Sequence, residues 1–255
     1  MSPGRRRPPT VVSIASSKGG VGKTTIAANL ACAISRATPT VLADFNAYSP
    51  DIEWALGLRP TYRLHDVARR LHEDPAGDID AMLTTVDSRL SVLCGPDSHI
   101  AADGVSAADI SVIHARLMSL GRTVVVDCGP VMTDHTIDAL EASSHIIVTT
   151  TTDVASVQAA RKLLDSISLL NIDPARVHLV VNRATSRVGL RVADVESRLG
   201  RNATILIPDS ERITESMNSG QSIVDSQPRS RIADRIRSLA DVILQPTDAP
   251  GGDAR

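Results

Sequence analysis

The sequence predicts one α/β domain in which a doubly wound, mostly parallel sheet is covered by helices on both faces. Short β-branched runs alternate along the chain with longer segments whose apolar residues have helical spacing. No Pro- or Gly-rich linker divides the 255 residues, a length that one large domain can accommodate. We therefore expect a folded unit over residues 10–244. The Arg- and Pro-rich residues 1–9 predict a disordered basic arm, and residues 245–255 predict a disordered tail.

The strongest motif is the segment Ser17–Thr25, which reads SKGGVGKTT. It follows an apolar run at 11–15, expected to be a buried strand, and it opens a segment at 25–34 expected to be a helix. A glycine loop in this position turns backbone N–H groups toward an anion, and the helix N-terminus adds partial positive charge. Lys23 can then reach the β- and γ-phosphates of ATP, and Thr24 can bind Mg²⁺. The expected nucleotide contacts in the loop are Lys18, Gly19, Gly20, Val21, Gly22, Lys23, Thr24 and Thr25.

Two features separate this segment from the strict G-x-x-x-x-G-K-[ST] pattern. Ser17 stands at the first glycine position, and a second lysine, Lys18, follows it. Lys18, Lys23 and Lys162 are the only lysines among 27 lysine and arginine residues, so the chain concentrates lysine in this loop. The loop resembles the deviant Walker A motif, a P-loop variant, of the ParA/MinD family of dimerising ATPases. The resemblance implies an ATP-dependent homodimer in which Lys18 reaches the nucleotide of the partner subunit.

Two carboxylates end predicted strands. Asp44 follows the run at 40–43, and Asp127 follows the run at 123–126. The carboxyl ends of parallel strands gather at one edge of a sheet, so both acids are expected beside the phosphate loop. Asp127 would hold the Mg²⁺ shell opposite Thr24. In the resemblance these residues occupy the Walker A′ and Walker B positions, which makes Thr24, Asp44 and Asp127 the expected metal site.

The stretch 44–57 resembles the MinD segment that starts D-x-D and closes with L/M-G. The second acid of that motif, which the family uses to position the attacking water, is Asn46 here. An asparagine can hold a water but accepts a proton far less readily than a carboxylate does. We therefore expect an ATPase that is slow or activated by a partner, with Lys18, Lys23, Asp44 and Asn46 in the catalytic machinery.

The remaining elements continue the alternation. Further strands are expected at 90–95, 145–149, 177–181 and 203–207, and helices are expected at 106–120, 154–169, 190–199 and 231–244. Two short helices are expected within 62–86. Ser106 and Asp109 form a plausible capping box for the helix at 106–120.

Several later segments also resemble MinD or its relatives. The helices at 62–86 followed by RLSVLCGP at 89–96 are similar to the pilus-assembly proteins TadZ and CpaE. The segments 150–157 and 213–224 resemble two further MinD motifs, so the resemblance covers residues 11–244. It implies that adenine is held by Asn182 and Arg183 after one strand and by Pro208 and Asp209 after the next.

Composition argues against a generally basic nucleic-acid-binding protein, a disulfide-bonded protein and a membrane-anchored one. The formal net charge of −2 gives no nucleic-acid signal for the whole molecule, so a DNA contact would need a local patch. The cysteines Cys32, Cys94 and Cys128 are widely spaced in apolar runs and predict reduced core residues in a cytoplasmic protein. The residues at 245–255 lack amphipathic spacing, so we expect no direct membrane anchor.

Three functions remain open. The first is a positioning ATPase of the MinD/TadZ kind, which acts in pilus, secretion or division-site placement through an unidentified protein partner or activator. The second is a ParA-type partition ATPase that binds DNA nonspecifically. Its candidate DNA contacts are Arg183, Arg187, Arg191, Arg198 and Arg201. The third is a nucleotide-gated scaffold that scarcely hydrolyses ATP, which Asn46 suggests.

Overall fold

A central sheet with strand order β3-β4-β2-β5-β1-β6-β7-β8 organises the computed structural model. The structure describes residues 9–46, 49–130, 132–186 and 188–245. The predicted arm and tail, apart from Pro9 and Gln245, therefore lie outside the described residues, as does Arg187. The strands are β1 (Val11–Ala15), β2 (Thr40–Phe45), β3 (Thr84–Thr85), β4 (Leu90–Leu93), β5 (Thr123–Cys128), β6 (His145–Thr150), β7 (Val177–Val181) and β8 (Ile205–Leu206).

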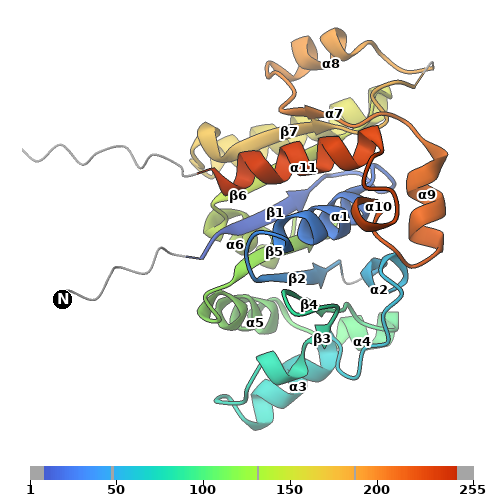
Figure 1. The fold of residues 1–255 in the computed structure, drawn as a ribbon. Helices are drawn as coiled ribbons and strands as arrows, with labels where there is room; N and C mark the ends of the chain where they lie inside the picture. Colours follow the sequence, from blue (N-terminus) through green and yellow to red (C-terminus); the bar gives the residue numbers. More distant parts are fainter. Residues whose placement is uncertain (1–8, 47–48, 131, 187, 246–255) are drawn as a thin grey trace, which may run out of the picture.

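Neighbouring strands pair in parallel except at one edge, where β3 runs antiparallel to β4. The parallel strands place all their carboxyl ends on the side where α2, α9 and α10 lie in Figure 1. Because β1, β2 and β5 are neighbours at the centre of the sheet, the loops that follow them meet at this edge.

Helices cover both faces of the sheet (Figure 1). On one face lie α1 (Lys23–Ser35), α10 (Ile223–Ser226) and α11 (Arg231–Leu244). On the other face lie α5 (Ala107–Ser119), α6 (Asp134–Ala142) and α7 (Val154–Leu169). Around these are α2 (Ile52–Ala55), α3 (Leu64–Glu73), α4 (His99–Asp103), α8 (Val192–Leu199), α9 (Glu211–Asn218) and the 3-10 turns at Asp80–Met82 and Pro174–Arg176.

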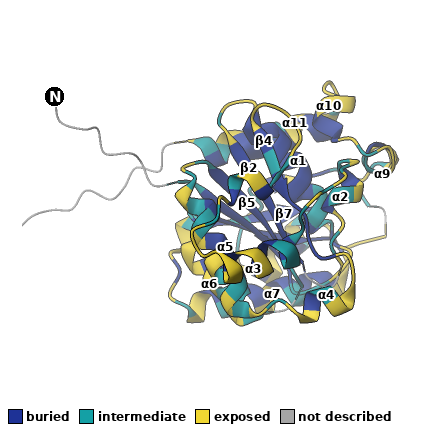
Figure 2. Cartoon of the chain, turned by 90° about the horizontal axis from the view of Figure 1, so that it is seen from below, coloured by how far each residue is buried: buried dark blue, intermediate teal, exposed yellow. Residues whose placement is uncertain are grey.

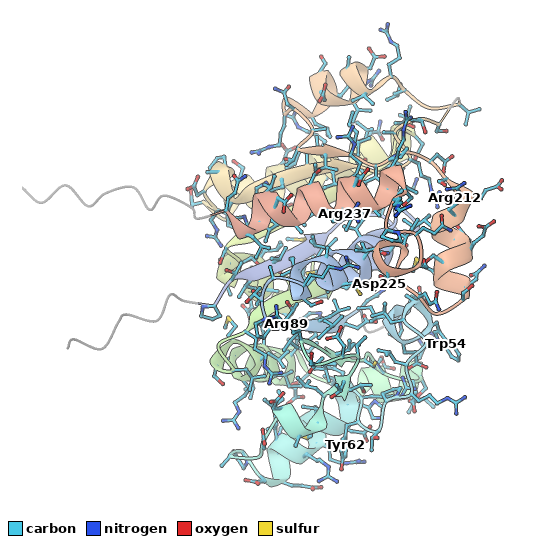
Figure 3. All side chains as sticks on the ribbon, viewed as in Figure 1. Trp54, Tyr62, Arg89, Arg212, Asp225 and Arg237 are labelled. Atoms are coloured by element: carbon cyan, nitrogen blue, oxygen red, sulfur yellow. The ribbon has the colours of Figure 1, made fainter. Side chains whose placement is uncertain are left out.

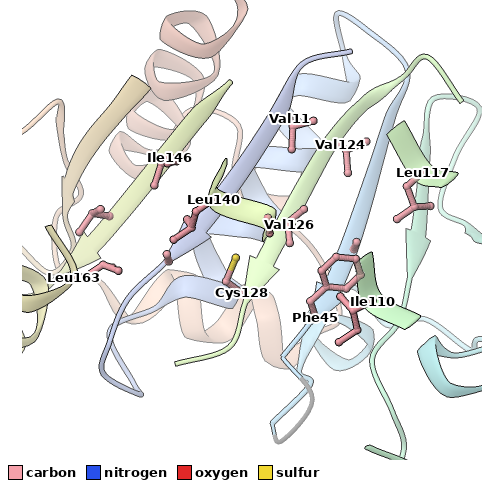
Figure 4. Packing of buried hydrophobic residues seen from close by; sticks show 14 of the residues in the cluster. Val11, Phe45, Ile110, Leu117, Val124, Val126, Cys128, Leu140, Ile146 and Leu163 are labelled. Carbon is pink, nitrogen blue, oxygen red and sulfur yellow. The ribbon is translucent and has the colours of Figure 1, made fainter. Parts of the chain in front are cut away.

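Alternate residues of each central strand enter two separate hydrophobic cores. In β1, Val11 packs with Val124 on the face of α5 and α6, whereas Val12 packs with Val125 on the face of α1. Figure 4 shows the first core, where Phe45 lies beside Ile110. Figure 2 shows the buried residues gathered in the strands between the helices. Burial of both faces explains why the strands read as continuous apolar runs.

The structure confirms the fold class and most of the predicted elements. The bounds of α7 and α11 are those expected, and α5 begins with the predicted capping box between Ser106 and Asp109. All three cysteines are buried and free.

Some helices and strands differ from their predicted type or bounds. The second helix expected within 62–86 is only the 3-10 turn Asp80–Met82, because the backbone is already extended at Leu83 and leads into β3. The strand expected at 203–207 is reduced to Ile205–Leu206, at the edge of the sheet. The helix expected from 190 starts at Val192, with Arg191 as its N-cap residue. Among the described residues, no helix is both long and apolar enough to cross a bilayer.

Candidate nucleotide-binding site

The phosphate loop connects the carboxyl end of β1 to the first residue of α1. Gly22, the residue before α1, is left-handed with φ of 94°, and a Cβ on it would lie 2.3 Å from the Asn182 side-chain nitrogen. Only glycine meets both demands. Within the described chain, no side chain caps the N-terminus of α1. The first N–H groups of this helix are therefore open to an anion, as a phosphate site requires.

Lys23 lies inside this loop with its side chain almost covered. The residue is 6% exposed, and its Nζ donates one long hydrogen bond, 3.4 Å, to the carbonyl oxygen of Lys18. Burial lowers the pKa of Lys23, while the nearby Asp127 opposes this effect. A buried ammonium group with so little compensation is stabilised by an anionic ligand.

Asp44 and Asp127 lie side by side at the ends of β2 and β5, where they are direct partners in the sheet register. Both are fully buried. The Thr24 hydroxyl donates to Asp127 Oδ2 at 2.6 Å, while Asp127 Oδ1 is buried with no hydrogen-bond partner in the described part of the chain. The three residues predicted for Mg²⁺ thus come together around an unsatisfied carboxylate oxygen.

The electrostatics of this pair also fit a divalent cation. Burial raises the pKa of Asp127 to about 7, against opposing effects of Thr24 and Lys23. Burial, followed by repulsion from Asp127, raises the pKa of Asp44 well above its usual range. A bound cation would favour the charged form of both acids. Hard carboxylate and hydroxyl oxygens are the ligands that Mg²⁺ prefers, so these residues fit Mg²⁺.

Asn46 lies two residues beyond Asp44 and is held by its surroundings. Its backbone N–H donates to Asp44 Oδ1 at 3.1 Å, and its side-chain nitrogen donates to the carbonyl oxygen of Ser49 at 2.6 Å. Its Oδ1 is buried and accepts no hydrogen bond from the residues that the structure describes. This oxygen is an acceptor available to a water molecule.

Lys18, the additional lysine of the loop, contacts residues at the start of α7 in its own chain. Its Nζ lies 2.8 Å from Asp153 Oδ1 and 3.0 Å from the Ser156 hydroxyl. Asp153 caps α7, and Lys18 and Asp153 side chains are 39% and 49% exposed. Although burial opposes it, hydrogen bonds from Lys18, Ser156 and Thr151 hold the pKa of Asp153 well below its usual range. This contact was not predicted from the sequence.

The residues predicted to hold adenine lie at the ends of β7 and β8. The Asn182 side chain donates to the carbonyl oxygen of Val21 at 2.9 Å, so it fixes the phosphate loop. Its oxygen accepts from the N–H of Arg183, whose φ is 51°. The Asp209 N–H donates to the Thr185 hydroxyl at 3.0 Å. The structure thereby gives Asn182 a contact with the loop that the motif comparison did not predict.

Two of the five arginines considered for DNA contact, Arg191 and Arg201, form contacts within the chain. Arg191 forms an ion pair with Asp194 at 2.9 Å, although its side chain is 85% exposed. The Arg201 guanidinium donates to the carbonyl oxygens of Val177 and Pro174 at 2.7 and 3.3 Å. These contacts weaken the case for a free basic surface at this end of the molecule.

The fold and the site together define an α/β protein with a P-loop-type phosphate site at the carboxyl edge of its sheet. The family model of the CobQ/CobB/MinD/ParA nucleotide binding domain matches residues 12–223. The chain belongs to this family, whose MinD and ParA members are ATPases.

Individual relatives agree with this assignment. The chain is 25% identical over 241 residues to the septum site-determining protein MinD of Thermotoga maritima, covering 90% of this chain and 86% of the relative. It is 26% identical over 254 residues to the sporulation initiation inhibitor protein Soj of Bacillus subtilis, covering 90% and 96%. The solved structure of MinD complexed with Mg-ADP from Pyrococcus horikoshii has the same fold, with a TM-score of 0.80, 18% identity and coverage of 93% and 96%.

Proposed function

We propose that this chain is a MinD/ParA-like ATPase that binds Mg·ATP, dimerises in the ATP state and positions other machinery through a protein partner. The observation that carries the proposal is the convergence of a buried Lys23, an uncapped helix N-terminus and the Thr24–Asp127 pair with its unsatisfied oxygen. These groups supply phosphate contacts and metal ligands at one edge of the sheet. We also propose the cytoplasm as its location, because Cys32, Cys94 and Cys128 are buried and free, as in reduced proteins.

Lys18 supports the proposed dimer because it can exchange its present ion-pair partner for another anion. Its present partner, Asp153, is half exposed, and such surface ion pairs contribute about 0–1 kcal/mol to stability. Lys18 can therefore leave Asp153 for the phosphates of a second subunit at little cost. This is the role that the deviant Walker A resemblance implies for the residue.

The nucleotide site is tested by calorimetric titration of Mg·ATP into the parent protein, Lys23→Ala and Lys162→Ala. Lys162 lies exposed on α7, which makes it the matched control for loss of a lysine. We expect Lys23→Ala to bind about 10- to 100-fold more weakly, because it loses a charged phosphate contact. Lys162→Ala should bind like the parent. Equal affinities for all three proteins would contradict the site.

Placement of pili, secretion systems or the division site is the proposed biological role, and the TadZ/CpaE-like order of elements supports the first of these. A ParA-type role would require the ATP dimer to bind DNA with a steep salt dependence. Because Arg191 and Arg201 are already engaged, we favour the protein partner. DNA binding in the ATP state that weakens steeply between low and physiological salt would reverse this preference.

A further inference from the structure

Two glycines from distant parts of the chain, Gly57 and Gly220, contact each other through their backbones. Both are left-handed, with φ of 61° and 65°. A Cβ on Gly220 would lie 2.8 Å from the Gly57 Cα and 3.0 Å from its nitrogen, and a Cβ on Gly57 would lie 3.1 Å from the Gly220 carbonyl oxygen. No side chain fits between them. The contact joins the loop after α2 directly to the loop after α9, at the carboxyl edge of the sheet (Figure 1).

Gly57 belongs to the segment that begins at Asp44. The Asp44 carboxylate accepts a hydrogen bond from the N–H of Ile52, the first residue of α2, at 3.3 Å. At the other end of this four-residue helix, the N–H of Gly57 donates to the carbonyl oxygen of Trp54 at 3.3 Å. Because α2 is so short, a displacement of Gly57 is passed along it to the hydrogen bond on Asp44.

Gly220 belongs to the segment that begins at the turn of Pro208 and Asp209. It follows α9, and the N–H of Ile223, three residues further on, donates to the side-chain oxygen of Asn29 at 2.7 Å. Asn29 is completely buried, and its side-chain nitrogen donates to the carbonyl oxygen of Thr25 at 2.8 Å. Thr25 lies in the first turn of α1, so Gly220 is tied to the helix that carries the phosphate loop.

We propose that the Gly57–Gly220 contact sets the separation between the Asp44 segment and the α9–α10 segment, and that both glycines are positioning residues for the nucleotide site. The inference rests on the proposed function insofar as that site holds Mg·ATP. Contacts run in a closed ring from the phosphate-loop helix through α10, the two glycines and α2 to Asp44. The ring closes because Asp44 is paired with Asp127 in the sheet, and Asp127 accepts a hydrogen bond from Thr24 of α1. Widening the ring at its glycine contact moves Asp44 relative to Thr24 and Lys23, although neither glycine belongs to the phosphate loop.

The test compares Gly220→Ala with Gly200→Ala. Gly200 has nearly the same conformation, with φ of 64°, but a Cβ there meets nothing within 4 Å. Both variants therefore carry the cost of a left-handed alanine, and only Gly220→Ala also pushes the two loops apart. We expect the affinity for Mg·ATP, measured by calorimetry, to fall about tenfold in Gly220→Ala relative to Gly200→Ala, because small misplacements of binding groups are costly. Equal affinities in the two variants would overturn the inference.

Trp54 provides a second measurement that needs no nucleotide. It is the only tryptophan, its side chain is 72% exposed, and it projects from α2 on the same side of the molecule as α9 (Figure 3). Its fluorescence emission and its quenching by acrylamide should change in nucleotide-free Gly220→Ala and remain parental in Gly200→Ala. If the parent fails to bind Mg·ATP, the proposed function fails, while this comparison still decides the inference: unchanged fluorescence refutes it.

If Gly220→Ala does not fold, a second pair of variants with a milder steric clash tests the same proposal. A Cβ on Gly57 comes no closer than 3.1 Å to Gly220, whereas a Cβ on Gly121, with φ of 69°, meets nothing within 4 Å. Gly57→Ala should bind Mg·ATP more weakly than Gly121→Ala. Equal binding by these two proteins would overturn the inference as well.

Discussion

At the scale of single residues, the two buried acids Asp44 and Asp127 carry a cost that a bound cation would relieve. They are adjacent across β2 and β5, both are fully buried, and one oxygen of Asp127 has no hydrogen-bond partner among the described residues. The two buried acids therefore lower the stability of the ligand-free protein, and a bound cation would offset this cost. This trade is common where function needs destabilised groups.

The pH dependence of stability tests this cost. The folded-state pKa of Asp127 is about 7, above its ordinary value of 3.8, so the folded protein binds more protons than the unfolded one between these values. Stability of the nucleotide-free, metal-free protein should consequently fall as pH rises through about 7. Each unit by which the folded pKa exceeds the unfolded one costs about 1.4 kcal/mol at high pH.

Asp127→Asn removes this titration, so its melting temperature should decline less steeply with pH than that of the parent. At pH about 8, above the folded pKa, we expect Asp127→Asn to be the more stable protein in the absence of Mg²⁺. Calorimetric unfolding over a range of pH measures both. If the melting temperatures of the two proteins change with pH in parallel, ionisation of Asp127 does not destabilise the fold as predicted.

Asn46 leads to a prediction about the rate of hydrolysis. Its unsatisfied oxygen can hold a water but cannot take a proton at neutral pH. Asn46→Asp should raise ATP turnover by up to about 10²-fold, the contribution of a positioned general base, with little change in ATP affinity. Phosphate release assays measure this. Turnover in the parent as fast as in Asn46→Asp would remove the support for a slow enzyme or gated scaffold.

The residues of the site were predictable to different degrees. Lys23, Thr24, Asp44 and Asp127 follow from strand and helix signals, because parallel strand ends must meet at one edge of the sheet. The Lys18–Asp153 ion pair and the contact of Asn182 with Val21 were not predictable. They depend on how β7 and α7 pack beside the loop, which no local pattern encodes.

At the scale of elements, the sequence predicts the bounds of long helices better than those of short helices and strands. The long helices α7 and α11 repeat their apolar positions often enough to fix both ends. The four- and five-residue helices α2 and α4, and the two-residue strand β3, contain too few residues to show a period. The longer helix α6 also went unpredicted, although its apolar residues pack on β1.

The predicted capping box of α5 can be tested directly. The Ser106 hydroxyl accepts from the Asp109 N–H at 3.2 Å, and Asp109 accepts from the Ser106 N–H at 2.9 Å. Ser106→Ala should destabilise the protein by about 1 kcal/mol, as loss of an N-cap does. Ser119→Ala, at the other end of α5, is the control and should change stability by less than about 0.5 kcal/mol. Equal denaturation midpoints for Ser106→Ala and the parent would contradict the cap.

At the scale of the whole molecule, two hydrophobic cores hold one mostly parallel sheet between layers of helices. The carboxyl edge of that sheet carries the polar residues of the site, while the cores on either side are apolar. This arrangement follows from the alternation of strands and helices, which is why the fold class was predictable from the sequence.

We propose that ATP joins two copies of this chain through Lys18. The direct measurement is light scattering of the parent and of Lys18→Ala with Mg·ATP and with Mg·ADP, with Lys162→Ala as the control. We predict that the parent and Lys162→Ala form dimers with Mg·ATP only, whereas Lys18→Ala binds the nucleotide yet remains a monomer. A Lys18→Ala protein that dimerises like the parent, or a parent that stays monomeric with Mg·ATP, would contradict an ATP-dependent dimer joined by Lys18.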